Sequence, residues 1–394
     1  MGWTIRTAEE ADVPALVRAD WAAFGGQPSE AHIEAARDFL EVGRALVAED
    51  GDRVVGAGAA VGLELTVPGP VSVPTAGVTY VGVMPTHRRQ GILTALMARI
   101  AEDARRRGEP IAALLASEST IYRRFGYGAS VLAGAVELDR AYARLRNPPE
   151  VSGRVRLLDR DEMEAVLPEV HDRYRRQQPG EVSRTPGWWK RHLKDPEDRR
   201  GGAGPRFAAV WEGGEGFVTY RVAPRWDDGL PGGTLTVENL VAVSPEVRAG
   251  LWQYCFGIDL IRVIKAFVAL DDPLRWMLAD PRRLRTTSVT DFLWVNLLDV
   301  ETALSTRTYT SDAGLVLEVA DDGRYRLAGG VCRRTDDLPD LALEAPDLGA
   351  TYLGGVRFTT LARAGLVTEL TAGAVARADA LFGTSPGPMS STGF

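Results

Sequence analysis

The sequence predicts an α/β protein with more than one domain, and three observations lead to this class. The chain has 394 residues, which is long for one hydrophobic core, so two or three domains are expected. Its first third alternates strand-type and helix-type patterns. Within that third, a short apolar run follows an amphipathic helix, as it does in a parallel βαβ unit.

The N-terminal elements are predicted from turn and cap chemistry. Residues 1–26 indicate a short strand followed by a helix, for which Thr7 is the expected N-cap. Residues 44–61 contain two β-rich runs on either side of Asp50-Gly51, a pair that favours a tight turn. We therefore expect a hairpin there.

A strand, a loop, a helix and a second strand come next. Residues 71–85 predict a long strand, and the helix after it ends at Gly108. Residues 111–117 are short and apolar, which predicts a buried strand parallel to the first. The apolar stripe of the helix consists of Ile92, Leu93, Leu96, Met97, Ile100 and Ala104.

The loop before this helix, "PTHRRQG", has the composition of an anion site. Backbone N–H groups leading into a helix N-terminus attract anions, and Gly91 would let the backbone approach a bulky one. Arg88 and Arg89 suit phosphate. Solvated arginines and a glycine that only eases a turn explain the spacing equally well. Neither GxxxxGK[ST] nor GxGxxG occurs, so a nucleoside triphosphate or a dinucleotide is not the expected anion.

Composition and charge argue against several classes. The formal charge is -7, so no bulk attraction to nucleic acid or to an anionic membrane is expected. Cys255, Cys332 and four scattered histidines provide neither a disulfide framework nor metal-ligand spacing, so no metal is expected. The N-terminus lacks the apolar core of a signal peptide, and no run of about 18 apolar residues occurs. A cytoplasmic location is the expectation.

Two motifs then resemble a known family. Arg88-x-x-Gly91, after a strand and before an amphipathic helix, resembles the pyrophosphate loop of the GNAT acetyltransferases. The usual pattern, Q/R-x-x-G-x-G/A, ends in a small residue where this chain has Leu93. The longer string "PTHRRQGIL…ASESTIYRRFGYG", residues 85–128, together with the terminal Phe394, resembles the Eis (enhanced intracellular survival) family of N-acetyltransferases. This resemblance covers the whole chain and is strongest over 73–128.

The resemblance implies an acetyl-CoA site in the N-terminal domain. In GNAT enzymes one strand splays from its neighbour, and its free backbone groups pair with the pantetheine arm. The following loop holds the pyrophosphate through backbone N–H groups. The matching positions are Val81, Gly82 and Val83 on the strand; Arg88, Arg89, Gln90, Gly91, Ile92, Leu93 and Thr94 in the loop and first helical turn; and Ser117 and Glu118 after the buried strand.

The resemblance also implies the catalytic groups. Tyr122 matches the general acid, because a phenol with a pKa of roughly 10 suits protonation of a thiolate leaving group. Without the motif, Tyr122 would be read as a packing aromatic, like Phe125 and Tyr127. The family's general base is the free C-terminal carboxylate, which belongs to Phe394 in this chain. By composition alone, the Pro- and Gly-rich tail would be a frayed end.

The acceptor amine is not predicted. Residues 391–394 and the loop 21–27 carry no acidic side chain, whereas sites for polycationic amines usually need carboxylates. Aminoglycoside, polyamine, protein lysine and a small metabolite all remain open. The amine and further copies of the chain are the expected partners, since the resemblance implies a homohexamer.

The rest of the chain is expected to form two more domains. Residues 237–256 echo 78–97 as strand, proline and helix, although such pieces are common. The Eis-like plan makes this a second, degenerate GNAT-like domain, followed by a sterol-carrier-protein-like domain whose tail returns to the active site. The full prediction is thus tandem GNAT folds with mixed β-sheets plus that C-terminal domain. The expected division is 1–150, 151–287 and 288–394.

Two other functions compete with amine N-acetylation. The C-terminal domain could make the protein a lipid-binding carrier, or the chain could be a non-catalytic GNAT-like scaffold. The sequence favours the enzyme, because the phosphate loop, Tyr122 and an aromatic C-terminus occur together.

Overall fold

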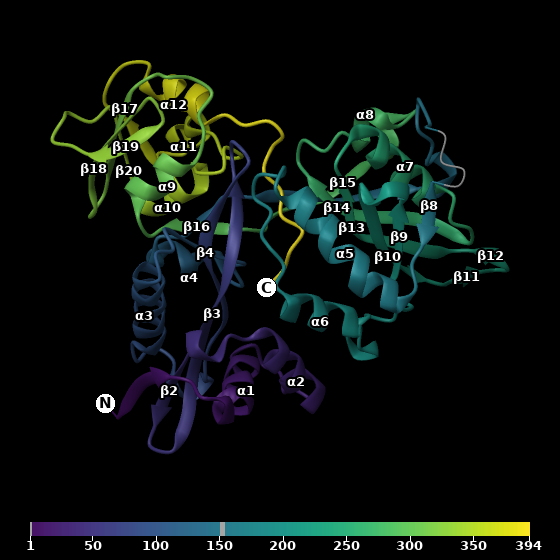
Figure 1. Ribbon diagram of the computed structural model, residues 1–394, viewed down its shortest axis with the longest axis horizontal. Coiled ribbons are helices and arrows are strands. Elements are labelled where there is room, and N and C mark those ends of the chain that lie inside the picture. Colours follow the sequence, from purple (N-terminus) through teal and green to yellow (C-terminus); the bar gives the residue numbers. More distant parts are fainter. Residues whose placement is uncertain (1, 150–153) are drawn as a thin grey trace.

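The computed structural model describes residues 2–149 and 154–394, which form three main sheets with helices packed on them (Figure 1). Two sheets are mixed and seven-stranded, and the third has five strands. In Figure 1 the N-terminal part lies below, the second sheet to the right, and the C-terminal domain above the first sheet. The predicted α/β class with mixed sheets is confirmed.

The first sheet has the order β1-β2-β3-β4-β5-β16-β6. Its helices cover opposite faces: Leu46 and Ala48 of β2 pack with α3, whereas Ala45 and Val47 pack with α1 and α2. The elements are β1 Trp3–Thr7, β2 Ala45–Asp50, β3 Arg53–Val67, β4 Val71–Val83, β5 Ile111–Leu114, β16 Trp294–Leu297, β6 Gly128–Ala129, α1 Val13–Ala23, α2 Glu30–Phe39, α3 Ile92–Arg106 and α4 Ser119–Tyr122.

The predicted hairpin and βαβ unit are present. β2 and β3 are antiparallel, with Asp50 opposite Arg53, and β4 and β5 are parallel, with Thr75 opposite Ile111. β5 ends at Leu114, three residues before the predicted end, because its pairing with β16 stops there, opposite Trp294.

The predicted N-cap at Thr7 is wrong. Thr7 is the last residue of β1, and α1 begins only at Val13. The side chains of Glu9 and Asp12 form a capping box around the short turn between them. This local hydrogen bonding delays the helix.

The second sheet has the order β15-β7-β14-β13-β10-β9-β8. Its β13-α7-β14 unit repeats β4-α3-β5, since β13 and β14 are parallel with Gly233 opposite Ile261. The predicted echo is therefore a structural repeat. The elements are β7 Leu132–Asp139, β8 Val155–Leu157, β9 Phe207–Trp211, β10 Gly216–Ala223, β13 Gly233–Ala242, β14 Ile261–Ala269, β15 Arg285–Asp291, the small pair β11 Trp226–Asp227 and β12 Leu230–Pro231, and helices α5 Arg160–Arg175, α6 Pro186–Lys194, α7 Pro245–Phe256 and α8 Leu274–Met277.

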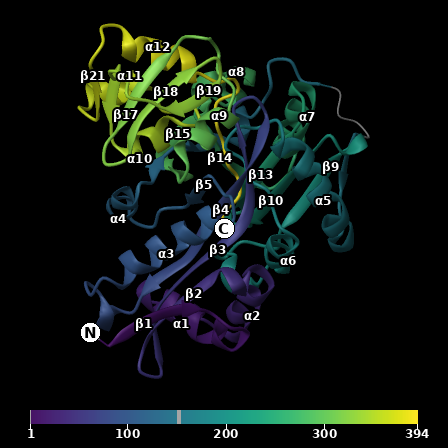
Figure 2. The same cartoon turned by 60° about the vertical axis from the view of Figure 1, so that its left-hand side comes forward.

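The C-terminal domain has a five-stranded sheet in the order β19-β18-β17-β20-β21. Its elements are α9 Val300–Thr306, β17 Leu315–Val319, β18 Gly323–Ala328, β19 Val331–Arg334, β20 Leu341–Leu343, α10 Ala345–Thr351, α11 Phe358–Arg363, β21 Val367–Glu369 and α12 Ala374–Phe382. After α12 the tail runs back between the other two parts, and its end lies beside β4 (Figure 2).

The three parts exchange strands and share a core. β7 pairs with β14 and β15 in the second sheet, and β16 pairs with β5 and β6 in the first. One buried cluster contains Val61 of β3, Leu167 of α5 and Leu317 of β17. The predicted domain limits at 150 and 287 stay predictions, and residue 150 itself lies outside the described residues.

Candidate functional site

β4 and β5 separate part-way along their length. They pair over residues 75–77 of β4, and beyond this no pairing joins them in the described chain, although β4 continues to Val83. The register between β3 and β4 shifts between Ala57 and Ala59, and Tyr80 in the bulge has a φ of +50°. Such a φ is rare for a bulky residue and bends the strand. The backbone edge at 78–83 can therefore pair with an extended ligand.

The loop before α3 leaves backbone amides free. Gly91 is the N-cap, with a φ of +85°, and no side chain of the described residues caps the helix. The first helical bond runs from Ala95 N to Gly91 O, at 3.0 Å. The N–H groups of the first turn thus have no partner inside the helix, which suits an anion.

The loop side chains have different surroundings. Arg89 is exposed, whereas Ile92 is buried in the core and Leu93 packs against it. Ile92 and Leu93 can therefore contribute only backbone groups. Arg88 is also exposed, but its Nη2 donates to the carbonyl oxygen of Ala23 at 2.8 Å, which ties the loop to the end of α1.

A pocket of about 210 Å³, the inner pocket, lies where β4 and β5 part. It brings four of the predicted site residues together, namely Val81, Ser117, Tyr122 and Phe394. Gly82, Val83 and Glu118 are not part of its lining, and Gly82 lies under α1, where a Cβ would be 2.8 Å from the Cα of Asp20. The complete lining is Asp20, Phe24, Val78, Thr79, Tyr80, Val81, Leu114, Leu115, Ser117, Tyr122 and Phe394.

Tyr122 is buried, with 6% of its surface exposed, and its ring meets that of Tyr127 edge-on at 6.4 Å. Burial raises the pKa of Tyr122, a polar contact with Ser117 works in the opposite direction, and the carboxyls of Asp20 and Glu118 raise it again. The phenol therefore keeps its proton at neutral pH and can donate it.

The tail that ends at Phe394 is held by the second part of the chain. Ser391 Oγ and Thr392 Oγ1 donate to the carboxylate of Glu181 at 2.7 and 2.6 Å. Arg184 Nε donates to Thr392 Oγ1 at 2.8 Å, and Trp188 Nε1 donates to the carbonyl oxygen of Gly393 at 2.6 Å. The last residue before the terminus is thus fixed by a direct hydrogen bond.

This anchoring cluster is buried. Glu181 and Thr392 are 0% exposed and Arg184 is 9% exposed. Burial alone would raise the pKa of Glu181, but the His171 ring, whose Nε2 lies 3.9 Å from the carboxylate, the charge of Arg184 and the Thr392 hydroxyl lower it to about 2. An ionised carboxylate with this many donors holds the tail in one place, so the tail is not the frayed end that its composition indicates.

Asp20 is a site residue that the sequence analysis missed. It lines the inner pocket, and burial raises its pKa to about 6. The signal was its position: Asp20 follows Leu16 by four residues and Val17 by three, and both are fully buried on α1. An acid on the buried stripe of a helix indicates a special environment.

A larger pocket of about 510 Å³, the outer pocket, adjoins the inner one. The two share Asp20, Thr79, Tyr80, Leu115 and Phe394. The second part of the chain supplies most of the remaining lining, which the sequence analysis missed: Trp188, Arg191, His192, Asp195, Pro196, Arg199, Arg206, Arg221 and Glu238. In the sequence, only the run "WWKRHLKDPEDRR" indicated that this segment could line a pocket.

The inference that the site lacks acidic side chains is too simple. Neither 21–27 nor 391–394 contains one, but Asp20, Asp195 and Glu238 line the outer pocket. Asp20 lies one residue before the first of these segments, and Glu238 belongs to β13. Folding brings them to the site from other elements.

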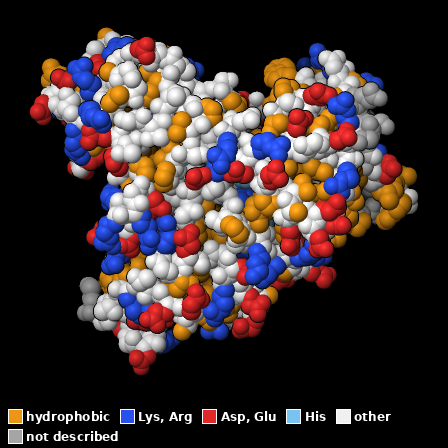
Figure 3. Space-filling view, viewed as in Figure 1, with side chains coloured by type: hydrophobic (Ala, Val, Ile, Leu, Met, Phe, Trp, Pro, Cys, Tyr) orange, Lys and Arg blue, Asp and Glu red, His pale blue; other side chains and the backbone are white. Residues whose placement is uncertain are grey.

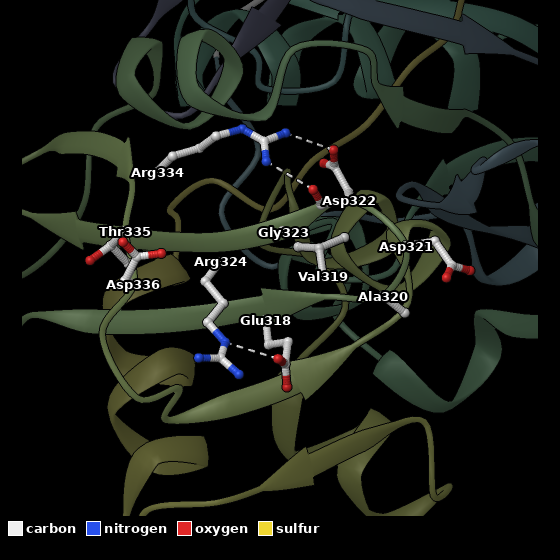
Figure 4. Close-up of a pocket in the computed structure, with 10 residues that line it drawn as sticks. All are labelled: Glu318, Val319, Ala320, Asp321, Asp322, Gly323, Arg324, Arg334, Thr335 and Asp336. Atoms are coloured by element: carbon white, nitrogen blue, oxygen red, sulfur yellow. Dashed lines mark hydrogen bonds and ion pairs between the residues drawn. The ribbon is translucent and has the colours of Figure 1, made fainter.

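The C-terminal domain carries a separate cavity of about 700 Å³ (Figure 4). Arg334 pairs with Asp322 at 3.0 Å, and Arg324 pairs with Glu318 at 2.9 Å. A lining this polar gives no support to the lipid-carrier alternative. The lining residues are Glu318, Val319, Ala320, Asp321, Asp322, Gly323, Arg324, Arg334, Thr335 and Asp336.

Residues 2–149 and 154–394 contain no group of three or more His, Cys, Asp or Glu side chains placed to hold a metal ion. Within the same residues, no helix has the length and apolar character needed to cross a membrane. Basic and acidic side chains are interspersed on the face shown in Figure 3.

The chain matches known families along most of its length. Residues 4–130 and 180–297 each match an acetyltransferase (GNAT) domain family. Residues 300–391 match a sterol carrier protein domain family. The predicted tandem GNAT folds and sterol-carrier-protein-like domain are thus confirmed.

Relatives and solved structures agree with these matches. An uncharacterized N-acetyltransferase of Streptomyces coelicolor is 39% identical over 94% of this chain and 95% of its own. N-acetyltransferase Eis of Mycobacterium tuberculosis is 34% identical over 96% of each chain. Eis1 from Mycobacterium abscessus is 36% identical and superposes with a TM-score of 0.90 over 99% of this chain and 100% of that one. The chain therefore belongs to the Eis family of N-acetyltransferases, enzymes with GNAT domains.

Proposed function

We propose that this protein transfers an acetyl group from acetyl-CoA to a primary amine of a small-molecule or lysine-type acceptor by direct attack. In this proposal Tyr122 is the general acid, and the terminal carboxylate of Phe394 is the general base. The observation that carries it is that these two residues, far apart in sequence, line the same inner pocket. That pocket lies where the two parallel strands separate.

Two features of the chain fit acetyl-CoA. The open edge of β4 offers backbone groups to an extended amide-containing arm, and the N-terminus of α3 offers free N–H groups to a diphosphate. When bound, acetyl-CoA supplies the acyl thioester. The residues proposed to hold it are Val81, Gly82, Val83, Arg88, Arg89, Gln90, Gly91, Ile92, Leu93, Thr94, Ser117 and Glu118.

The proposal requires three proton transfers, because the nitrogen loses two protons and the sulfur gains one. Tyr122, whose pKa is raised by burial, donates a proton to the departing sulfur. The carboxylates of Phe394 and Asp20, which line both pockets, take the two protons that the nitrogen loses, one from the incoming ammonium group and one as the amide forms. With a pKa of about 6, Asp20 is a stronger base than an ordinary carboxylate and is still mostly ionised at pH 7.

The test is thiol release from acetyl-CoA with a panel of primary amines. Tyr122→Phe should lower kcat by about 10²- to 10⁴-fold, as loss of a general acid does, with an unchanged Kd for acetyl-CoA in calorimetry. Tyr142→Phe is the control, because Tyr142 is 43% exposed. A chain whose C-terminus is converted to an amide should lose activity similarly, since it keeps the Phe394 ring and loses the charge.

The outcomes separate mechanism from function. Full activity of Tyr122→Phe and of the amidated chain would overturn the proton roles. If calorimetry showed no binding of acetyl-CoA to the unmodified protein, the proposed function would fail.

The family also supports two proposals about organisation. We propose a homohexamer, to be measured by sedimentation equilibrium, and a division of the chain near residues 150 and 287. A cytoplasmic location remains a prediction.

A further inference from the structure

The outer pocket is lined by four arginines, two of which are neutralised within the protein. Arg206 Nε lies 2.5 Å from the carboxylate of Glu238, and Arg221 Nε lies 2.6 Å from its other oxygen. Arg221 also pairs with Asp195. These four side chains form one network and leave little net charge.

Arg191 and Arg199, the other two arginines of the outer pocket, differ from these in their charge pairing. In the described residues, no carboxylate lies within 4.0 Å of either guanidinium, although both line the outer pocket. Arg191, on α6, is half-buried with its Cζ 3.8 Å from the centre of the Phe39 ring. Burial lowers the pKa of Arg191, a polar contact with the Tyr80 phenol works in the opposite direction, and the nearby positive charge of Arg199 lowers the pKa again. A partly buried cation without an anion has lost hydration that a bound anion would replace.

Opposite charges lie at the boundary with the inner pocket. Asp20 and Phe394 each carry a carboxyl group and line both pockets, so two acidic groups belong to the boundary between the pockets. The outer pocket therefore has carboxylates at its inner end and two unpaired guanidiniums elsewhere in its wall. A volume of about 510 Å³ fits a small molecule.

We propose that the acceptor is a small primary amine that also carries an anionic group, a carboxylate or a phosphate, held by Arg191 and Arg199. This inference rests on the proposed function and names its substrate class. The amine end meets Asp20 and Phe394, and the anionic end forms charge-assisted hydrogen bonds with the guanidiniums. A diamine or larger polycation would place its second charge beside Arg191 and Arg199, which disfavours it.

Three acceptors of equal chain length test this: 5-aminopentanoate, pentylamine and pentane-1,5-diamine, assayed by thiol release with saturating acetyl-CoA. For the unmodified protein we expect kcat/KM for 5-aminopentanoate to exceed that for pentylamine by about tenfold or more, the scale of one charge-assisted hydrogen bond. The diamine should be the poorest of the three.

Charge reversal at Arg199 is the sharpest variant, because this side chain is exposed and its replacement leaves the core intact. Arg199→Glu should lower kcat/KM for 5-aminopentanoate by about tenfold or more, raise it for the diamine, and change it by less than about twofold for pentylamine. Arg191→Gln should lower kcat/KM for 5-aminopentanoate only. Arg191→Lys should lower it less, because lysine keeps the positive charge. Arg53→Glu, an exposed change at the β2–β3 turn, is the matched control.

Every result decides the inference. Equal use of the three acceptors, or a preference for the diamine, would overturn it and leave the proposed function standing. If none of the three is acetylated although acetyl-CoA binds, calorimetry with the products 5-acetamidopentanoate and N-pentylacetamide decides, and failure to bind the anionic product overturns it. Absence of acetyl-CoA binding would instead remove the proposed function, and this inference with it.

Discussion

At the residue scale, Asp20 shows how burial sets the chemistry of a common side chain. It lies on α1 with no cation within 4.0 Å in the described part of the chain, and burial raises its pKa to about 6. An aspartate in water has a pKa of about 3.9. At neutral pH the Asp20 carboxylate is therefore a better proton acceptor than a surface aspartate, and it lies next to Phe394 in both pockets.

The pH profile tests this role. Asp20 accepts a proton only when ionised, so kcat/KM should fall as the pH drops through about 6, because the raised pKa protonates it there. The free fraction of the acceptor amine also changes with pH. The informative quantity is therefore kcat/KM of the unmodified protein divided by kcat/KM of Asp20→Asn. That ratio should be large and constant above pH 7 and should shrink below about pH 6.

The control for this prediction is Asp52→Asn, at an exposed turn. The kcat/KM of the unmodified protein divided by that of Asp52→Asn should be near one at every pH. A ratio for Asp20→Asn that does not change between pH 5 and pH 8 would contradict the assignment of Asp20 as a base.

At the element scale, the two βαβ units differ at the helix N-terminus. Gly91 caps α3 without a side chain, whereas the Ser244 hydroxyl caps α7 by accepting from Val247 N at 3.3 Å. In α7 a side chain thus uses an amide that stays free in α3. The opening beyond β13 and β14 is also lined by the tail residues Met389 and Ser391. This repeat consequently has one free amide fewer than the first, and its opening holds only about 60 Å³.

Substituting Gly91 tests the α3 terminus. Gly91→Ala forces alanine to a φ of +85°, which should lower the free energy of unfolding by about 1 kcal/mol. The nearest atom to the new Cβ would be Trp3 Cζ2 at 3.9 Å, so no clash adds to this. The cradle for the diphosphate should also be distorted, so we expect a rise of at least about tenfold in KM for acetyl-CoA.

Gly108→Ala is the matched control, because Gly108 has a φ of +75° just beyond the other end of α3 and nothing lies within 4 Å of its Cβ position. It should cost similar stability and leave KM for acetyl-CoA unchanged. An equal rise in KM for both variants would mean that the effect comes from helix stability and not from the loop.

At the scale of the whole molecule, the proposed active site is assembled from all three parts. The first sheet supplies the opening and Tyr122, the second part supplies Glu181 and Arg184, and the C-terminal domain supplies the tail. The C-terminal domain also holds the segment next to Tyr122, since Arg123 Nη1 donates to the buried Asp347 at 2.8 Å. The relative position of Tyr122 and Phe394, the proposed acid and base, therefore depends on how the domains pack.

Glu181→Gln tests this dependence. The amide carries no charge and accepts the Ser391 and Thr392 hydroxyls less strongly, so the tail should loosen. We expect kcat to fall by about tenfold or more with little change in KM for acetyl-CoA. Glu164→Gln, an exposed change on α5, is the control. An unchanged kcat would mean that the cluster does not position Phe394.

The same variant predicts a pH effect on stability. The pKa of Glu181 is about 2 in the folded protein and about 4.3 in an unfolded chain, so its stabilising effect is complete above the higher value. It is lost as the pH falls through the lower one. The difference in unfolding free energy between the unmodified protein and Glu181→Gln should be constant from pH 5 to 7 and should shrink between about pH 4 and 2.

Local features could be predicted because their causes are local in sequence. The β2–β3 turn follows from Asp50-Gly51, and α3 follows from an apolar stripe with a period of about 3.6 residues. The loop at Gly91 and the residue Tyr122 belong to one contiguous motif, so resemblance alone could name them. The N-cap prediction for α1 was wrong. Glu9 and Asp12 form a capping box between Thr7 and the helix, and the N-cap preference of a single threonine does not reveal such a box.

The sequence by itself determined the class of fold, the family and the half of the proposed site contained in residues 81–122. Only the tertiary structure decided that Asp20, Arg191 and Arg199 line pockets beside that motif, and that the tail ends there. The physical reason is that burial and charge pairing arise from contacts between elements far apart in the chain. The raised pKa of an aspartate on α1 and the lowered pKa of a half-buried arginine on α6 arise only when other parts of the folded chain exclude water from them.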